Sequence, residues 1–263
     1  MKEVAVVIPI YKNNFEQFEI TALKQCFNVL RNHPIIFVKP ESLLLKSDQF
    51  DFENIPQISF PDSYFKSALT YNELMLSFNF YESFLDYKYI LIYQLDAFVF
   101  KDDLIFWCNK NYDYIGAPWI ASISNNPLVM MLNKISSIFD SKEKKERKKI
   151  FFKVGNGGFS LRKVASHYQI SKENANYINE LLTSKRGSLN AIEDVFWSLK
   201  AIDFMPSFKI PGYKEALNFA IDRKPELAFK LNKNQIPFGC HGIDKPKVVR
   251  FWETFILKYV NNK

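Results

Sequence analysis

The first residue that could do chemistry is a single carboxylate inside an apolar run. The run YILIYQLDAFVFK spans Tyr89–Lys101, and Asp96 lies in it two positions after Gln94. Ionised carboxylates are seldom buried without a cationic partner, hydrogen-bond donors or a metal. Open α/β sheets bind ligands in the crevice at the carboxyl ends of their strands. Asp96 is therefore either a ligand-binding group at the end of a buried strand or only a residue that begins a turn.

A second candidate is the pair of adjacent acids Glu193 and Asp194, which lies at the start of a predicted helix, Ala191–Ile202. Acidic side chains at this position complement the helix dipole, which requires no function. A carboxylate held rigidly at a helix start is also suited to accept a proton from a bound hydroxyl group. Both interpretations stay open on these residues alone.

A glycine-rich segment is the third feature. The sequence VGNGGFSLRK (Val154–Lys163) contains Gly155, Gly157 and Gly158, three of only eight glycines in the chain. Such a cluster indicates either a tight turn that needs positive φ or a close approach of the backbone to a ligand. These residues fit both explanations.

The elements that position these residues follow from the spacing of apolar residues. We expect strands at Val4–Ile10, Pro34–Pro40, Gln57–Phe60, Tyr89–Tyr93 and Tyr114–Ala117, and helices at Phe15–Arg31, Thr70–Leu85, Asp103–Asn109, Asn176–Thr183, Ala191–Ile202 and Val248–Val260. The strand–helix–strand opening predicts a βαβ unit and a parallel sheet. The alternation dissolves after Trp119, where Pro127–Phe139 is amphipathic. No GxGxxG follows the first strand, and no GxxxxGK[ST] motif occurs.

Composition is that of a soluble globular protein, with 48% apolar and 24% charged residues among 263. That length suits one domain or one domain with an elaboration. Cys26, Cys108 and Cys240 lie far apart, which favours a reducing compartment. Met1–Ile10 reads as a strand rather than a signal peptide, and no apolar run reaches the length of a membrane span. We therefore expect a cytoplasmic protein.

The positive charge is concentrated in one run. Net charge is +7, and SKEKKERKKI (Ser141–Ile150) carries much of it, which favours anionic partners. The run is either a solvated helix face or loop, or a basic flap that contacts an anionic acceptor or a membrane. On the second interpretation Lys142–Lys149 would bind the inner face of the cytoplasmic membrane peripherally. Nucleic acid is not expected, because no nucleic-acid-binding motif is present.

Several segments together resemble known enzymes. VIPIYKN resembles the first strand and loop of glycosyltransferases with the GT-A fold. An uncharacterised bacterial family, whose members are regarded as glycosyltransferases of surface-polysaccharide assembly, is similar in six further segments in the same order. These are YILIYQLDAF, YDYIGAPW (Tyr112–Trp119), GNGGFSLR (Gly155–Arg162), EDVFW (Glu193–Trp197), ALNFAID (Ala216–Asp222) and PFGCHG (Pro237–Gly242).

The resemblance implies an α/β fold with a GT-A-like, mostly parallel central sheet flanked by helices and an acceptor-side elaboration after the Asp96 strand. It implies one domain, 1–263, with a nucleotide-binding half at 1–118, an acceptor-side half at 119–246 and a C-terminal helix at 247–263. The implied activity is transfer of a sugar from a nucleotide-sugar, such as a UDP-sugar, to a hydroxyl of a surface-polysaccharide or lipid-linked glycan acceptor. The implied mechanism is inverting, with Asp194 favoured over Glu193 as the general base.

The resemblance also implies a divalent cation, Mn²⁺ or Mg²⁺, at a DxD element that is incomplete here. Gln94 stands where the first Asp would be in one register, and Phe98 replaces the second in the other. One carboxylate still suffices for a cation that takes phosphate oxygens, and His241 is the second implied ligand beside Asp96. A non-catalytic nucleotide-sugar-binding module therefore stays an alternative.

The remaining implied contacts fall into two groups. The nucleotide-sugar would contact Pro9, Ile10, Tyr11, Asn13, Ser67, Tyr71, Asn72, Gln94, Leu95 and Asp96. The sugar or acceptor would contact Gly116, Ala117, Trp119, Asn156, Gly157 and Gly158. Simple packing or loop solvation is the alternative interpretation for each of these residues.

Overall fold

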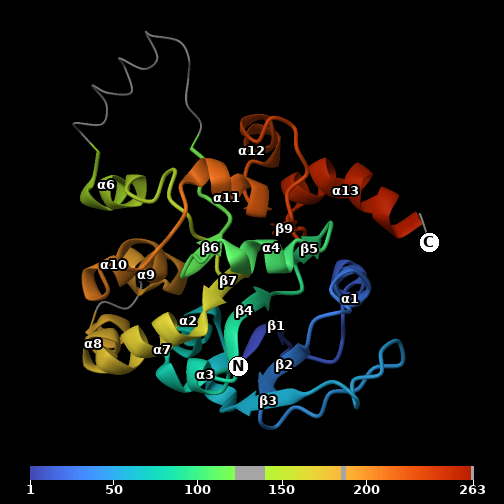
Figure 1. The fold of residues 1–263 in the computed structure, drawn as a ribbon, viewed down its shortest axis with the longest axis horizontal. Helices are drawn as coiled ribbons and strands as arrows, with labels where there is room; N and C mark the ends of the chain where they lie inside the picture. The colour runs from blue at the N-terminus through green and yellow to red at the C-terminus, as the bar shows by residue number, and fades with distance from the viewer. Residues whose placement is uncertain (122–139, 185–187, 262–263) are drawn as a thin grey trace.

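The computed structural model describes residues 1–121, 140–184 and 188–261. The predicted amphipathic stretch Pro127–Phe139 lies outside the described residues. Figure 1 shows the central sheet running across the molecule from β3 (Gln57–Phe60) at the bottom to β6 (Tyr114–Gly116) near the centre. Helix α1 (Gln17–Val29) lies on one side, and α2 (Ala68–Leu76), α3 (Phe78–Glu82) and α7 (Val164–Glu173) lie on the other. The fold is thus α/β, with a mostly parallel sheet flanked by helices.

The N-terminal half forms the parallel part of this sheet. Its elements are β1 (Lys2–Pro9), α1 (Gln17–Val29), β2 (Ile35–Pro40), β3 (Gln57–Phe60) and β4 (Tyr87–Tyr93). β1 pairs in parallel with both β2 and β4, and β2 pairs in parallel with β3, which confirms the predicted βαβ unit. After β1, the chain adds β2 and β3 on one side of β1 and then adds β4 on the other side. The strand order therefore reverses between β1 and β4, and a crevice at their carboxyl ends is the expected ligand site.

The remaining strands of the central sheet are β7 (Phe159–Lys163) and β6 (Tyr114–Gly116), which complete the order β3-β2-β1-β4-β7-β6. β7 is antiparallel to both β4 and β6, and Tyr93 lies opposite Phe159. Because β7 runs in the reverse direction, the glycine-rich segment before it lies at the carboxyl end of β4. This strand was not predicted, because the glycines concealed the short apolar pattern after them.

A second, three-stranded sheet determines where His241 lies. It consists of β5 (Ala97–Val99), β9 (Gly239–His241) and β8 (Ala220–Ile221), in the order β5-β9-β8. Ala97 and His241 are paired in the antiparallel ladder between β5 and β9. This register brings His241 to the residue that follows Asp96, although the two are far apart in sequence.

Two predicted helices are interrupted. The predicted helix Thr70–Leu85 is α2 (Ala68–Leu76) and α3 (Phe78–Glu82), because Ser77 adopts extended backbone geometry and its hydroxyl accepts a hydrogen bond from Phe80 N, 3.2 Å away. In place of the predicted helix Ala191–Ile202, the chain forms a 3₁₀ turn, η2 (Leu189–Ala191), followed by two short helices, α9 (Glu193–Leu199) and α10 (Ala201–Phe204). The other helical elements are η1 (Asp62–Phe65), α4 (Leu104–Asn109), α6 (Lys142–Lys148), α7 (Val164–Glu173), α8 (Ala175–Ser184), α11 (Tyr213–Phe219), α12 (Pro225–Leu231) and α13 (Pro246–Asn261).

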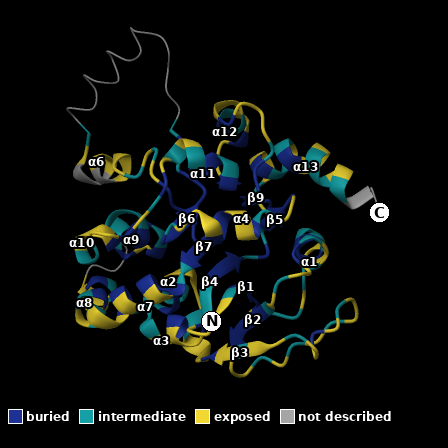
Figure 2. Cartoon of the chain, in the orientation of Figure 1, coloured by how far each residue is buried: buried dark blue, intermediate teal, exposed yellow. Residues whose placement is uncertain are grey.

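Buried apolar side chains form one continuous cluster that includes residues of both sheets. Figure 2 shows the central strands as the buried part of the molecule, with exposed residues on the outer helices and loops. Phenylalanines contribute many of the largest fully buried side chains, among them Phe37, Phe80, Phe84, Phe98 and Phe159. At the far end of the cluster, Trp252 of α13 is fully buried against Phe100 and Phe229.

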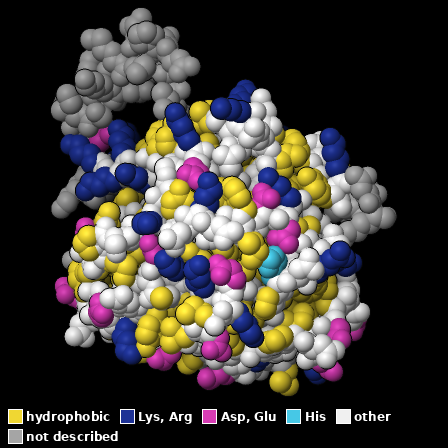
Figure 3. All heavy atoms as spheres, viewed as in Figure 1, with side chains coloured by type: hydrophobic (Ala, Val, Ile, Leu, Met, Phe, Trp, Pro, Cys, Tyr) yellow, Lys and Arg dark blue, Asp and Glu magenta, His cyan; other side chains and the backbone are white. Residues whose placement is uncertain are grey.

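The basic run forms α6 and the residues after it. Side chains of Lys144, Lys145, Arg147, Lys148 and Lys149 are exposed, and Figure 3 shows the cluster of Lys and Arg at this corner. Within the described part of the chain, no helix has both the length and the apolar character to cross a membrane. Peripheral contact of α6 with a membrane stays a prediction.

Replacing Trp252 by alanine tests how firmly α13 is packed. Loss of a fully buried aromatic side chain in a dense cluster costs about 3–5 kcal/mol of unfolding free energy. We expect the midpoint of guanidinium unfolding to fall accordingly. Arg250→Ala, an exposed change on the same helix, should alter the unfolding free energy by less than about 0.5 kcal/mol. Equal midpoints for Trp252→Ala and the unmodified protein would contradict this packing.

Candidate functional site

A cleft of about 450 Å³ lies at the carboxyl ends of β1 and β4, where the strand order reverses. Seven of the ten residues predicted to contact a nucleotide-sugar line this cleft. The seven are Pro9, Tyr11, Ser67, Tyr71, Gln94, Leu95 and Asp96. The cleft is also lined by Glu19, Lys66 and Asp244, for which the sequence predicts no role.

The other three predicted nucleotide contacts have structural partners. Ile10 is fully buried in the core. The Asn13 side chain holds a neighbouring loop, because its amide donates to Leu44 O and its carbonyl accepts from Lys46 N, at 2.9 and 3.0 Å. Asn72 Oδ1 accepts from the backbone N–H of Glu193 at 3.4 Å, so it helps to satisfy the first turn of α9.

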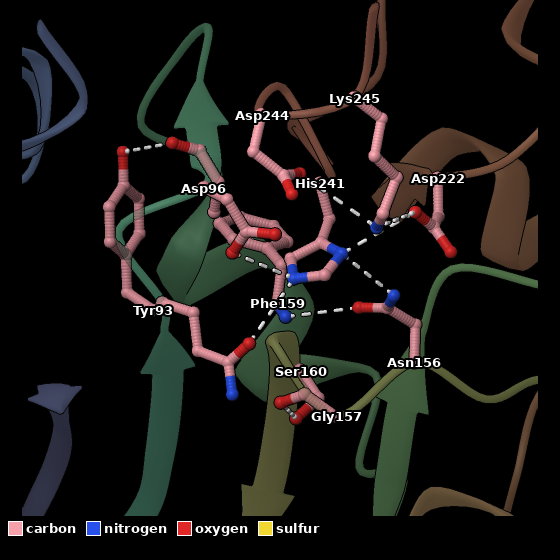
Figure 4. Close-up of polar contacts among 12 residues, drawn as sticks. Tyr93, Asp96, Asn156, Gly157, Phe159, Ser160, Asp222, His241, Asp244 and Lys245 are labelled. Atoms are coloured by element: carbon pink, nitrogen blue, oxygen red, sulfur yellow. Dashed lines mark hydrogen bonds and ion pairs between the residues drawn. The ribbon is translucent and has the colours of Figure 1, made fainter. Parts of the chain in front are cut away.

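Asp96 and His241 face each other at the end of β4. His241 Nε2 lies 3.0 Å from Asp96 Oδ1 and 3.3 Å from Gln94 Oε1. The other ring nitrogen, Nδ1, lies 2.9 Å from Asn156 Nδ2 and 3.4 Å from Asp222 Oδ1. Figure 4 shows the imidazole between Asp96 on one side and Asp222 on the other. The histidine therefore joins β4, β9, the glycine-rich segment and the end of β8.

The charges around His241 favour its protonated form. Burial lowers the pKa of His241, but the hydrogen bonds and charges of Asp222 and Asp96 outweigh burial and raise the pKa to about 9. Burial likewise raises the pKa of Asp96, but the hydrogen bond and charge of His241, together with the charge of Lys245, outweigh burial and hold the pKa of that carboxyl below its usual range. The contacts at Nδ1 require opposite states, since Asn156 donates to an unprotonated nitrogen and Asp222 accepts from a protonated one. Without a cation, the two facing carboxylates favour the imidazolium, so His241 has to lose the Nε2 proton before that nitrogen can bind a metal.

The donor set at Asp96 fits a divalent cation. Two ligands of one octahedral Mg²⁺ or Mn²⁺ ion, each about 2.1 Å from it, lie roughly 3 Å apart, which matches the separation of Asp96 Oδ1 and His241 Nε2. Gln94 Oε1 is a third donor on the same side, and Asp222 behind the ring would orient the imidazole. In residues 1–121, 140–184 and 188–261, no group of three His, Cys, Asp or Glu side chains could hold a metal. Water or phosphate oxygens would have to complete the coordination.

The glycine-rich segment needs residues without a side chain because other side chains lie directly against its backbone. A Cβ on Gly158 would lie 2.0 Å from His241 Nε2 and 2.5 Å from Gln94 Oε1, and one on Gly157 would lie 1.6 Å from Glu193 Oε1. Asn156, rather than a glycine of this segment, has positive φ, at 62°. A turn with positive φ therefore does not explain these glycines, and the groups that approach their backbone are other parts of this chain; close approach to a ligand stays a prediction.

Glu193 is held in a fully buried ion pair. Arg162 Nη2 lies 3.1 Å from Glu193 Oε2, and the guanidinium also donates to Tyr81 OH at 2.9 Å and Ser160 Oγ at 3.0 Å. Burial raises the pKa of Glu193, and the charge of Arg162 opposes this only in part. Glu193 thus ties the start of α9 to β7.

Asp194 has a different environment from its neighbour. Burial, and next the charge of Glu193, raise the pKa of Asp194 to about 7, against smaller opposing effects of Arg162 and the backbone of Val195 and Asn156. Its Oδ1 is buried, and no hydrogen-bond partner for it lies among the described residues. Asp194 is therefore an acid that titrates near neutrality beside the segment whose Asn156 contacts His241.

The predicted acceptor residues before the basic run pack behind the glycine-rich segment. Ala117 O accepts from Gly155 N at 3.1 Å, and the half-buried Trp119 ring lies directly over Gly155. A Cβ on Gly116 would lie 2.1 Å from Gly155 O. Contact of Gly116, Ala117 or Trp119 with a sugar stays a prediction.

Sequence reasoning missed Asp222, Asp244 and Arg162. Asp222 carries the signal by which Asp96 was found, because it also directly follows an apolar strand, here only Ala220–Ile221. That strand is too short to recognise from its pattern. Asp244 and Lys245 follow the predicted His241 segment within four residues, but no spacing rule distinguishes them from a solvated turn.

The fold and site together define an α/β protein with a cleft at the point where the strand order of a mostly parallel sheet reverses. The chain belongs to the family described as protein of unknown function (DUF5672), whose model matches residues 54–241. No curated protein is significantly similar to it in sequence.

Two solved structures are similar in arrangement. One is a glycosyltransferase involved in the glycosylation of the major capsid of PBCV-1, at a TM-score of 0.49 and 10% identity over 91% of this chain and 93% of that one. The other is the apo-form glycosyltransferase GlyE of Streptococcus pneumoniae TIGR4, at a TM-score of 0.43 and 13% identity over 92% of this chain and 54% of that one. Both TM-scores lie below 0.5, so an activity must be argued from the site itself.

Breaking the buried ion pair tests its structural role. Arg162→Met leaves the Glu193 carboxylate without its partner, and we expect a loss of about 3–5 kcal/mol in unfolding free energy by denaturant titration. Arg162→Met combined with Glu193→Leu should lose less than the sum of the single changes, because the groups are in direct contact. Additive losses would contradict the pairing. As a control, Asp203→Asn removes only an exposed ion pair with Lys200 and should cost less than about 1 kcal/mol.

Proposed function

We propose that this protein is a glycosyltransferase that moves a sugar from a nucleotide-sugar, a UDP-sugar, to a hydroxyl of a glycan or lipid-linked acceptor. The observation that carries the proposal is the cleft at the β1–β4 reversal with the Asp96–His241 pair at its end. Its volume of about 450 Å³ lies in the range of small-molecule sites, roughly 300–1,000 Å³. Tyr11, 58% exposed at the cleft, offers a flat ring for a base.

The charges in the cleft favour a cation-dependent donor. Glu19, Asp96 and Asp244 are acidic, and Lys66 is the one basic residue among those that line the described cleft. Glu19 is paired with Lys12 at 2.8 Å, but a diphosphate would be repelled by the carboxylates of Asp96 and Asp244 unless a cation lay between them. A divalent ion held by Asp96 and His241 would neutralise the charge that the leaving diphosphate gathers. Gln94 would keep its amide oxygen toward the same ion.

Asp194 would act as the general base. The acceptor oxygen attacks the anomeric carbon, the bond from that carbon to the diphosphate oxygen breaks, and the acceptor proton passes to the Asp194 carboxylate. One such displacement inverts the configuration at the anomeric carbon. A base with a pKa of about 7 is close to optimal at neutral pH. Glu193 cannot fill this role while it is paired with Arg162, so it acts by raising the pKa of its neighbour.

A second candidate function is a non-catalytic nucleotide-sugar-binding module. Two observations favour it: Gln94 and Phe98 stand where a DxD element would have carboxylates, and the part of the chain that the structure describes contains no cluster of three metal-binding His, Cys, Asp or Glu side chains. Such a module would bind UDP but never release it from UDP-glucose or UDP-galactose.

The pH dependence of UDP release tests the base. With UDP-glucose or UDP-galactose and Mn²⁺, we expect release to rise with pH through about 7, because Asp194 accepts a proton only when ionised. Asp194→Asn should lower release by roughly 100-fold or more and leave UDP binding intact. Asp203→Asn, on the neighbouring helix, should retain both the rate and the profile. Undiminished release by Asp194→Asn would exclude Asp194 as the base.

Removal of the cation or of its ligand tests the metal site. EDTA, and separately Asp96→Ala, should weaken UDP binding by at least about tenfold in calorimetric titrations. Asp203→Asn, which changes an exposed carboxylate outside the cleft, should retain the response to Mn²⁺. If neither EDTA nor Asp96→Ala changes the affinity for UDP, the metal hypothesis is wrong.

A further inference from the structure

A second, larger groove lies where α12 and α13 begin. Its volume is about 800 Å³. Five of its residues are basic against one acid, Glu226, and the basic residues are Arg223, Lys224, Lys245, Lys247 and Arg250. Four further residues give it apolar walls: Pro225, Leu227, Pro246 and Val248. The groove is therefore cationic and apolar at once, whereas the first cleft is acidic.

The start of α13 carries positive charge, which is unfavourable at the amino end of a helix. The first turn of this 16-residue helix contains Lys247 and no acid, although the amino end of a helix favours anions. In the described chain, neither Lys247 nor Arg250 has an ion-pair partner within 4.0 Å. An anion in the groove would offset both the repulsion among the basic side chains and the unfavourable charge at the helix end. These two features are independent of the groove's shape.

The groove adjoins the His241 site through one turn. Gly242, with φ of 78°, begins a turn in which Lys245 N donates to Gly242 O at 3.0 Å. Asp244 lines the first cleft and Lys245 lines the groove. Lys245 Nζ lies 3.9 Å from Asp222 Oδ1, which in turn contacts His241. Figure 4 shows Lys245 and Asp222 on the side of His241 away from Asp96. A molecule in the groove would therefore lie beside the donor site, separated from it by the His241 contacts.

We propose that this groove binds a diphosphate or phosphate group of the acceptor, which would make the acceptor of the proposed transferase a phosphorylated molecule. That the bound molecule is the acceptor rests on the proposed function. That the groove binds an anion rests on the groove alone. Lys247, Arg250 and Lys245 hold the phosphate oxygens. Leu227 and Pro246 contact the apolar part of whatever the phosphate is attached to. A soluble sugar phosphate and a lipid-linked diphosphate share this chemistry.

The test is a calorimetric titration of the full chain with inorganic pyrophosphate in metal-free buffer. Lys247→Ala/Arg250→Ala removes two exposed cations of the groove and should weaken binding at least about tenfold, because each contact is a charge-assisted hydrogen bond. Lys24→Ala/Arg31→Ala removes the same pair of side-chain types from the exposed surface at α1 and should retain the original affinity. Thermal melting of both variants checks that they remain folded.

Three results would overturn the proposal. Unchanged affinity in the groove variant would mean that pyrophosphate does not bind in the groove, and an equal loss in the α1 control would mean that pyrophosphate senses only net charge. If Tyr11→Ala weakens the binding of pyrophosphate and the groove variant does not, pyrophosphate binds in the first cleft. Farnesyl diphosphate distinguishes the two sources: tighter binding than pyrophosphate, reversed by Leu227→Ala, indicates a lipid-linked acceptor, and equal binding of the two probes indicates a soluble one.

Failure of the proposed function would look different. If the unmodified protein never releases UDP from its donors but the groove variant binds pyrophosphate more weakly, the anion site is supported and the transferase activity is excluded. If UDP is released and pyrophosphate binding does not depend on the groove, the transferase stands and the phosphorylated acceptor is wrong.

Discussion

The candidate site depends on the buried ion pair between Arg162 and Glu193. Removing two charges from water is costly, and such pairs seldom add net stability. This pair is retained with donors and acceptors around it, since Tyr81, Ser160 and the carbonyl of Gly157 all bind the guanidinium. Its effect is positional, because it fixes the start of α9 against the strand that follows the glycine-rich segment. The next residue, Asp194, is thereby held beside that segment.

The pair also explains why two adjacent acids differ. Successive residues of a helix point about 100° apart, so when Glu193 turns into the core toward Arg162, Asp194 turns toward the Asn156 backbone. Burial and the nearby Glu193 charge then raise the pKa of Asp194 to about 7. Glu193 is held as the partner of Arg162, whereas Oδ1 of Asp194 has no hydrogen-bond partner among the described residues. Adjacent carboxylates placed in different environments can take different roles in acid–base chemistry.

Much of the parallel sheet could be predicted from the sequence, whereas most of the second sheet could not. β1, β2 and β4 are continuous apolar runs, and β3 was placed at Gln57–Phe60 as observed. β5, β8 and β9 have two or three residues each, too few for any periodicity. The pairing of Ala97 with His241 depends on that sheet, so the sequence could nominate Asp96 and His241 separately but contained no local signal that they meet. That expectation came only from the resemblance to GT-A enzymes.

The distribution of charge links the two recesses to one another. The first cleft has three acids and one base, and the groove at α12 and α13 has five bases and one acid. The chain has a net charge of +7, but its charged residues are unevenly distributed around His241. Acidic residues dominate on one side and basic residues on the other, and Asp222 and Lys245 lie between the two recesses. An acidic cleft accepts a diphosphate only together with a cation, and a basic groove accepts one without it. Two anionic ligands could therefore bind next to each other, with opposite dependence on a divalent ion.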